Sequence, residues 1–154
     1  MDKPILVAVV DDHAIVRQGL VGMLSRDDRF EVAGEADSGF KAIDLVVDTQ
    51  PDVVLMDVSM PDLDGIAATR QIKKLEPETR VIALTMHQDR AHIRQAFEAG
   101  VSGYLLKRND LGDLIAAIEA VMAGDIFLSP GISRVVVQAF LGDRGDVVAG
   151  GKAD

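Results

Sequence analysis

Residues 53–65 have the sequence VVLMDVSMPDLDG, in which an apolar run leads directly to an aspartate, Asp57. A continuous apolar run that turn residues follow indicates a strand buried on both of its faces. Such strands occur in parallel sheets that helices cover on both sides. A charged side chain directly after a strand of this kind is expected at the carboxyl edge of the sheet, where open α/β sheets bind their ligands.

Four further strand-like runs flank this one and alternate with helical patterns. Short strands separated by helices are typical of βαβ units, which build a parallel sheet. Because such crossovers are right-handed, the pattern predicts a doubly wound α/β domain with helices on both faces of a five-stranded parallel sheet. The predicted strands are Ile5 to Val10, Phe30 to Glu35, Val53 to Met56, Arg80 to Leu84 and Gly103 to Leu106.

Helical patterns lie between these strands. Ser38 suits a helix N-cap and Asp64 suits another, while Gly100 and Gly124 stand where helix C-terminal glycines are expected. A weaker apolar pattern runs from Asp89 to Ala99. The clearest pattern forms a stripe that must pack on the sheet, and it consists of Leu111, Leu114, Ile115, Ile118, Val121 and Met122.

Composition limits the classes of protein that the chain can belong to. Its 154 residues, 48% of them apolar, are enough for one domain with a substantial core. There is no cysteine, which excludes disulfides and cysteine-ligated metals, and no apolar stretch has the length of a membrane helix. We therefore expect a soluble, cytoplasmic protein. A net charge of −9 without any basic patch argues against DNA binding by these residues.

The character of the chain changes near its C-terminal end. We expect the α/β domain to occupy residues 1–128. Residues 129–141 are apolar enough for a linker or an extra helix. Residues 142–154, rich in Gly, Asp and small residues, indicate a disordered tail or a truncated linker to a missing output domain.

Five reactive side chains follow four of the predicted strands. Asp11 and Asp12 follow the first, Asp57 the third, Thr85 the fourth and Lys107 the fifth. Three carboxylates held close together repel one another, and they favour a hard divalent cation such as Mg²⁺. Asp57 can then act as a nucleophile on phosphorus and form an aspartyl phosphate. Mg²⁺, the Lys107 ammonium and the Thr85 hydroxyl would stabilise the charge of the phosphoryl oxygens.

Four motifs carry a resemblance to a known family: VVDDH (residues 9–13), VLMDVSMPDLDG (54–65), ALT (83–85) and GYLLK (103–107). In this order and spacing they resemble the receiver domains of two-component response regulators, over residues 4 to about 128. The resemblance implies the flavodoxin-like receiver fold, with strand order 2-1-3-4-5. DDHAIVRQGL and AGVSGYLLK further resemble the NarL/FixJ class, which carries a LuxR-type helix-turn-helix. Many receivers have a proline after the lysine, whereas Arg108 follows here.

The family resemblance also implies roles for individual residues. Asp57 resembles the phosphoacceptor, to which a sensor histidine kinase transfers the phosphoryl group. Asp12 resembles a direct Mg²⁺ ligand, and Asp11 a partner acting through bound water. The backbone carbonyl of Ser59 resembles the third protein ligand of the ion, and Lys107 resembles the lysine that contacts the phosphoryl group. Thr85 resembles the switch hydroxyl, and Tyr104 the aromatic residue whose rotamer changes when this hydroxyl moves.

The resemblance implies a regulator that catalyses only its own phosphorylation and dephosphorylation. It further implies that the protein forms a homodimer on phosphorylation. DNA would be bound only through a C-terminal domain outside this chain. Two alternatives stay open from the sequence. The chain could be a single-domain regulator that acts through protein partners. It could also be a Mg²⁺-dependent phosphohydrolase with an aspartate nucleophile, although Ser59 stands where haloacid-dehalogenase-type phosphatases carry a second aspartate.

Some residues have simpler interpretations. Tyr104 suits a half-buried aromatic with a hydrated hydroxyl about as well as a switch residue. His13, His87 and His92 lack the paired spacing and the supporting carboxylates of a metal site, which favours surface or capping roles.

Overall fold

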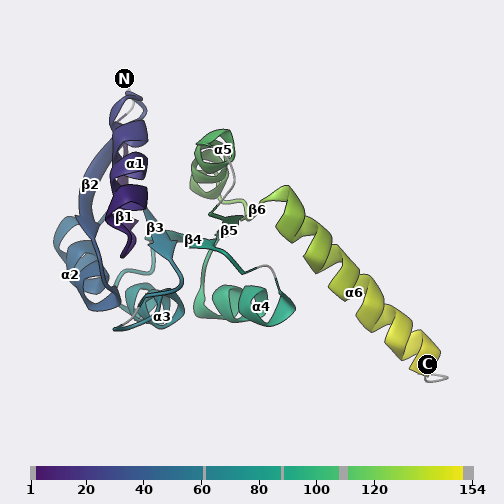
Figure 1. Ribbon diagram of the computed structural model, residues 1–154. Helices are drawn as coiled ribbons and strands as arrows, with labels where there is room; N and C mark the ends of the chain where they lie inside the picture. The colour runs from purple at the N-terminus through teal and green to yellow at the C-terminus, as the bar shows by residue number, and fades with distance from the viewer. Residues whose placement is uncertain (1–2, 61, 88, 108–110, 151–154) are drawn as a thin grey trace.

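The computed structural model describes residues 3–60, 62–87, 89–107 and 111–150. Strands and helices alternate along the chain (Figure 1). The strands are β1 (Ile5–Val10), β2 (Phe30–Ala36), β3 (Val53–Asp57), β4 (Arg80–Thr85), β5 (Gly103–Leu106) and β6 (Phe127–Leu128). The helices are α1 (Ala14–Ser25), α2 (Gly39–Thr49), α3 (Gly65–Leu75), α4 (Arg90–Ala99), α5 (Leu111–Met122) and α6 (Pro130–Gly150).

The strands form one parallel sheet in the order β2-β1-β3-β4-β5-β6. The predicted α/β class, the five strands and their order are confirmed. The structure adds a sixth strand, β6, in which Phe127 and Leu128 pair with Gly103 and Tyr104. Two residues are too few to show a strand pattern, so this strand could not be predicted from the sequence.

Two helical layers cover the sheet, with α1 and α5 on one face and α2, α3 and α4 on the other (Figure 1). The alternation of side chains along β1 shows how the layers are filled. Val7 and Val9 belong to the apolar cluster that contains residues of α1 and α5, whereas Ala8 and Val10 belong to the cluster that contains residues of α2, α3 and α4. Every residue of β3 is buried, which confirms that the strand is covered on both faces.

Helix ends follow the predicted capping residues. The Ser38 side chain accepts a hydrogen bond from Lys41 N, and Asp64 accepts one of 2.8 Å from Ala67 N. Gly100 ends α4 with φ at +113°, a left-handed conformation that glycine adopts without strain. Gly124, with φ at +91°, plays the same part after α5.

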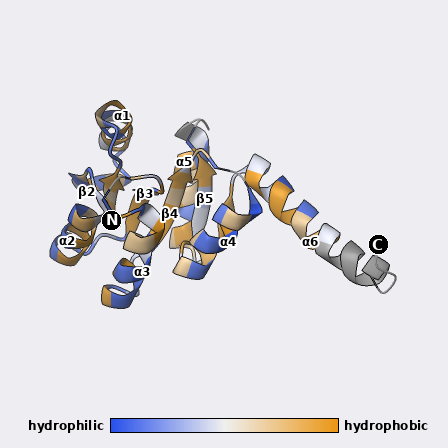
Figure 2. Ribbon diagram, turned by 60° about the horizontal axis from the view of Figure 1, so that its bottom comes forward, coloured by the Kyte–Doolittle hydropathy of each residue, from blue (hydrophilic) through white to orange (hydrophobic). Residues whose placement is uncertain are grey.

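Helix α6 extends away from the sheet beyond β5 and α4 (Figure 1), and the part of the helix nearest the sheet carries several apolar residues (Figure 2). Ile132 is fully buried in the same apolar cluster as Tyr104, which fixes the base of the helix. The helix runs across the boundary predicted at residues 141 and 142, and its described backbone is helical where we expected disorder. Extension of an existing helix adds a hydrogen bond for each residue fixed, whereas nucleation is the costly step. The division of the chain into domains stays a prediction.

No helix among the described residues combines the length and the apolar composition that a bilayer crossing requires.

The turn from β3 into α3 depends on Gly65. Its amide donates a hydrogen bond of 2.9 Å to Val58 O, so the start of α3 lies directly against the end of β3. A Cβ atom at position 65 would lie 2.2 Å from the carbonyl oxygen of Asp57 and 2.9 Å from Met56 Cγ. Glycine is therefore required at this position, because any side chain would push α3 away from Asp57.

We expect Gly65→Ala to lower the free energy of unfolding by about 2 kcal/mol, since overpacking of a buried contact typically costs 1–3 kcal/mol. Gly19→Ala is the matched control, because a Cβ atom at Gly19 in α1 would meet nothing within 4 Å. Alanine also favours a helix interior over glycine, so this control should leave stability unchanged or raise it by up to about 1 kcal/mol. Urea denaturation of both variants tests the difference, and equal stabilities would contradict the role of Gly65.

Candidate functional site at the carboxyl edge of the sheet

The structure brings the predicted reactive side chains together at the carboxyl edge of the sheet. Lys107 Nζ lies 3.0 Å from Asp11 Oδ2 and 3.1 Å from Asp57 Oδ1. Strand register explains the grouping: Asp57 pairs with Leu84, and Thr85 pairs with Leu106, so that consecutive strands end at the same level. Residues more than 90 positions apart in the sequence therefore contact one another at a single point.

Asp57 lies at the centre of the site and is 1% exposed. Its Oδ1 atom accepts a hydrogen bond of 3.2 Å from Ser59 N, besides the ion pair with Lys107. Its Oδ2 atom is buried and has no hydrogen-bond partner within the described part of the chain. Burial, Asp12 and the charge of Asp11 together raise the pKa of Asp57 to about 6, against the opposing effect of Lys107.

Asp11 and Asp12, which follow β1, supply the other two carboxylates of the site. Asp11 is fully buried, and its Oδ1 accepts a hydrogen bond of 2.8 Å from His13 N. His13 Nδ1 lies 3.2 Å from one oxygen of each aspartate, although its contact with Asp12 Oδ1 lacks hydrogen-bond geometry. Ligand atoms of Asp11, Asp12, His13 and Asp57 all lie within 4.8 Å of one another, close enough to share one metal ion.

Lys107 supplies the positive charge at the site. Its side chain is 13% exposed, and its amide donates a hydrogen bond of 2.8 Å to Thr85 O, which ties the segment after β5 to the end of β4. Burial alone would lower the pKa of Lys107, but hydrogen bonds with Asp11 and Asp57 outweigh burial and raise the pKa. Lys107 therefore stays charged at any physiological pH.

Thr85 and Tyr104 are linked through the backbone of His87. The Thr85 hydroxyl accepts a hydrogen bond of 2.9 Å from His87 N, and the Tyr104 hydroxyl donates one of 3.0 Å to His87 O. The interpretation of Tyr104 as a half-buried, hydrated aromatic is wrong, because the residue is fully buried. The sequence could not show that β6 and α6 would lie beside β5, where Leu128 and Ile132 join the apolar cluster of Tyr104. Burial raises the pKa of the Tyr104 hydroxyl.

The structure also groups polar residues that the sequence analysis left apart. We expected His87 and His92 to lack a neighbouring carboxylate, and this expectation is wrong. Asp89, the N-cap of α4, places its carboxylate 2.7 Å from His92 Nδ1. His87 and His92 line a pocket of about 350 Å³ together with Ser59 and Asp64. The contact between Asp89 and His92 could have been predicted from their spacing, because they lie three residues apart at the start of a helix.

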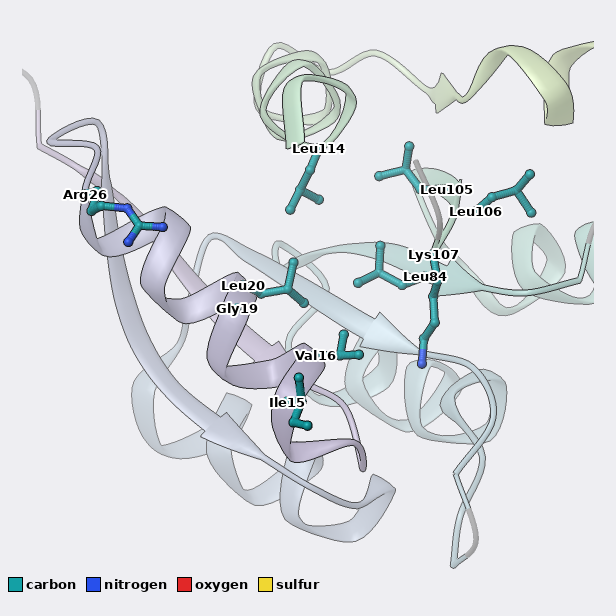
Figure 3. A pocket seen from close by; sticks show the side chains of 10 residues that line it. All are labelled: Ile15, Val16, Gly19, Leu20, Arg26, Leu84, Leu105, Leu106, Lys107 and Leu114. Carbon is teal, nitrogen blue, oxygen red and sulfur yellow. The ribbon is translucent and has the colours of Figure 1, made fainter. Parts of the chain in front are cut away.

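A larger pocket of about 410 Å³ opens between α1 and α5, with the Lys107 side chain at its inner end (Figure 3). Its other walls are mainly apolar side chains of α1, β4, β5 and α5. Ile15 and Val16 of α1 are 84% and 40% exposed at its rim. The apolar surface beside the charged site is therefore accessible to a partner.

Comparison with known proteins agrees with this geometry. The family model of the response regulator receiver domain matches residues 7–119. The chain is 39% identical over 130 residues to the response regulator GacA of Pseudomonas viridiflava, and 32% identical over 139 residues to the transcriptional regulatory protein DegU of Brevibacillus brevis. These alignments cover 84% and 90% of this chain, but 61% and 59% of the relatives. The chain thus spans about three fifths of the length of these relatives.

Solved structures show the same relationship. A two-component response regulator of the LuxR family from Aurantimonas sp. SI85-9A1 superposes with a TM-score of 0.85 at 38% identity, over 90% of this chain and 99% of that one. The receiver domain of the putative response regulator NarL from Mycobacterium tuberculosis gives 0.76 at 34% identity, over 80% and 99% of the two chains. Sequence, fold and the arrangement of acidic residues agree, and the chain belongs to the response regulator receiver domain family, within the NarL and LuxR group.

Proposed function

We propose that Asp57 accepts a phosphoryl group from a sensor histidine kinase. The single observation that carries this proposal is the buried Asp57 carboxylate, which has one oxygen paired with Lys107 and the other without a hydrogen-bond partner among the described residues. In the proposed step a bond forms between the free Oδ2 atom and phosphorus as the bond from phosphorus to the donor atom breaks. The reaction modifies the chain itself, which fits a family of regulators better than an enzyme that turns over small substrates.

Lys107 and Thr85 are placed to stabilise the charge of the phosphoryl group. The Lys107 ammonium already lies 3.1 Å from Asp57 Oδ1, so it can contact a phosphoryl oxygen without a large movement. The Thr85 hydroxyl, which is 1% exposed, stands at the end of the neighbouring strand. Phosphoryl transfer requires mainly positioning and charge stabilisation, and these groups supply both.

The acidic residues fit a Mg²⁺ ion. The carboxylates of Asp11, Asp12 and Asp57 lie together with the single ammonium of Lys107, and Asp12 Oδ1 is buried without a hydrogen-bond partner in the described structure. Such oxygens are the ligands that Mg²⁺ prefers. We infer that Asp12, Asp57 and the carbonyl of Ser59 would hold the ion directly and Asp11 through water. When bound, the ion would neutralise carboxylate charge and favour ionised Asp57.

The contacts of His87 suggest how phosphorylation of Asp57 would change the structure of the surface near α4. Thr85 and Tyr104 both bind the His87 backbone, one through its N–H and the other through its carbonyl. If the Thr85 hydroxyl turns towards a phosphoryl group, its hydrogen bond to His87 N must break. The β4–α4 segment and Tyr104 would then rearrange together, as an element with two alternative packings would.

We propose that the receiver controls a DNA-binding domain in a longer protein. The support is the length of the relatives, several of which are named as transcriptional regulatory proteins. A response regulator with 28% sequence identity, RcsB, has been solved in complex with DNA. We also propose that the protein works in the cytoplasm and dimerises on phosphorylation, with exposed Ile15 and Val16 of α1 as candidate partner contacts.

Incubation with acetyl phosphate and Mg²⁺ should add one phosphoryl group to the wild-type protein and none to Asp57→Asn, as intact mass will show. Chelation of Mg²⁺ should abolish the adduct. Asp62→Asn is the matched control, because Asp62 belongs to the same loop but accepts its hydrogen bonds from Gly39 N and Phe40 N. An adduct on folded Asp57→Asn, or none on the wild type, would refute the assignment of the phosphoacceptor.

The raised pKa of Asp57 predicts a pH-dependent difference in stability. Because the folded-state pKa, about 6, exceeds the unfolded value near 3.8, the stabilisation from protonated Asp57 is full below about pH 4 and is lost as pH rises through 6. Without Mg²⁺, Asp57→Asn should therefore gain about 2 kcal/mol relative to wild type between pH 4 and pH 8. Urea denaturation in chelator measures this gain. Parallel pH profiles of the two proteins would contradict the shifted pKa.

Tyr104 is the only tyrosine in a chain without tryptophan, so intrinsic fluorescence reports its environment alone. We expect acetyl phosphate with Mg²⁺ to change this fluorescence in the wild type, since the contacts of the Tyr104 hydroxyl would be rearranged. The change should be lost in Asp57→Asn and strongly reduced in Thr85→Ala, which lacks the hydroxyl. An equal change in Thr85→Ala would show that Tyr104 responds independently of Thr85.

A further inference from the structure

Two imidazole rings and a carboxylate gather where β4 leads into α4. The rings of His87 and His92 stack with their centroids 4.1 Å apart and an interplanar angle of 6°. Both oxygens of Asp89 lie within hydrogen-bond distance of His92 Nδ1, at 2.7 and 2.9 Å. Ligand atoms of these three residues all lie within 4.8 Å of one another. Each of these residues can donate an electron pair to a metal ion.

The local backbone holds this group in place. Asp89 is the N-cap of α4 and accepts a hydrogen bond of 3.3 Å from His92 N, which fixes its carboxylate beside the first turn of the helix. His87 is held by its own backbone bonds to Thr85 and Tyr104. Its side chain takes no part in those two bonds, so it is available for another contact.

We propose that His87, Asp89 and His92 form a binding site for a divalent transition-metal ion such as Zn²⁺, separate from the acidic pocket around Asp57. Imidazole nitrogens favour zinc and its neighbours over magnesium, which prefers oxygen ligands. The hydrogen bond between Asp89 and His92 Nδ1 leaves the other ring nitrogen of His92 free for the ion. In this arrangement the two imidazoles are the ligands and Asp89 orients His92, as carboxylates commonly do for the histidine ligands of zinc.

The site has room for an ion and its water ligands. His92 and Asp89 are 40% and 55% exposed, and both histidines line the 350 Å³ pocket next to Val58 and Ser59. In stacked parallel rings the nitrogen lone pairs lie in separate planes, so metal binding requires the rings to turn about their Cβ–Cγ bonds. Those torsions have broad energy wells, and the adjustment therefore costs little.

Titration calorimetry with Zn²⁺, in excess Mg²⁺ and without phosphodonor, tests the site. Wild type should bind one Zn²⁺ that His87→Gln and His92→Gln each bind about tenfold more weakly, or not at all. His87→Gln keeps the backbone N–H and carbonyl, so its contacts with Thr85 and Tyr104 should survive. His13→Gln is the matched control, because His13 belongs to the acidic pocket and should leave this Zn²⁺ affinity unchanged.

Nitrogen-15 spectra of the histidine rings give an independent measurement, in which zinc should shift the signals of His87 and His92 and leave those of His13 in place. Zinc affinity that is unchanged in both His87→Gln and His92→Gln would overturn the proposed site. Zinc binding lost only in His13→Gln would place the ion in the acidic pocket, and would overturn the proposal as well.

A metal ion on the His87 side chain would also act on the switch, and this extension rests on the proposed function of Thr85 and Tyr104. An ion that fixes His87 holds the backbone that both residues bind, so zinc should change Tyr104 fluorescence in wild type and leave it unchanged in His87→Gln. Coupling between two sites is reciprocal, so phosphorylation should change the affinity for zinc by the same factor by which zinc changes the phosphorylation equilibrium. Zinc binding without any change in Tyr104 fluorescence would refute the coupling and leave the site intact.

Discussion

The ammonium group of Lys107 holds two buried carboxylates, Asp11 and Asp57, at the end of the sheet. Burial of two carboxylates is costly unless a positive charge lies close to them, and Lys107 supplies that charge. One ammonium does not balance three carboxylates, and burial of Asp57, together with its aspartate neighbours, raises its pKa to about 6. The structure thus keeps Asp57 in an electrostatically unfavourable position that a bound cation would relieve. Functional sites are where proteins most often retain such a charge imbalance.

The register of the parallel strands brings residues that are distant in the sequence together in one site. Since β1, β3, β4 and β5 end at a common level, polar residues at or directly after these strand ends lie at one edge of the sheet. The turn at Gly65 adds a second constraint, because it brings α3 against the carbonyl of Asp57 itself. Stability and chemistry are therefore coupled here: the packing that secures the sheet also determines how far apart the charged groups lie.

Much of this arrangement could be predicted from the sequence. The continuous apolar run of β3 predicted a doubly covered strand, and polar residues after successive strands predicted their meeting point. The burial of Tyr104 could not be predicted, because it depends on the two-residue strand β6 and on Ile132, which no periodicity reveals. The grouping of His87 with His92 was missed for a similar reason. It depends on how Asp89 caps α4, a local geometry that residue spacing alone does not determine.

Helix α6 gives the fold a long projection with a narrow base. Its first turn is anchored by Ile132 in the apolar cluster that contains Tyr104, and its 21 residues extend about 30 Å at 1.5 Å per residue. Such a helix acts as a lever. A tilt of about 10° at the anchored end moves the far end by roughly 5 Å, about one helical turn. A change of side-chain packing too small to alter the sheet would therefore become a displacement large enough to reposition whatever the chain carries beyond the helix.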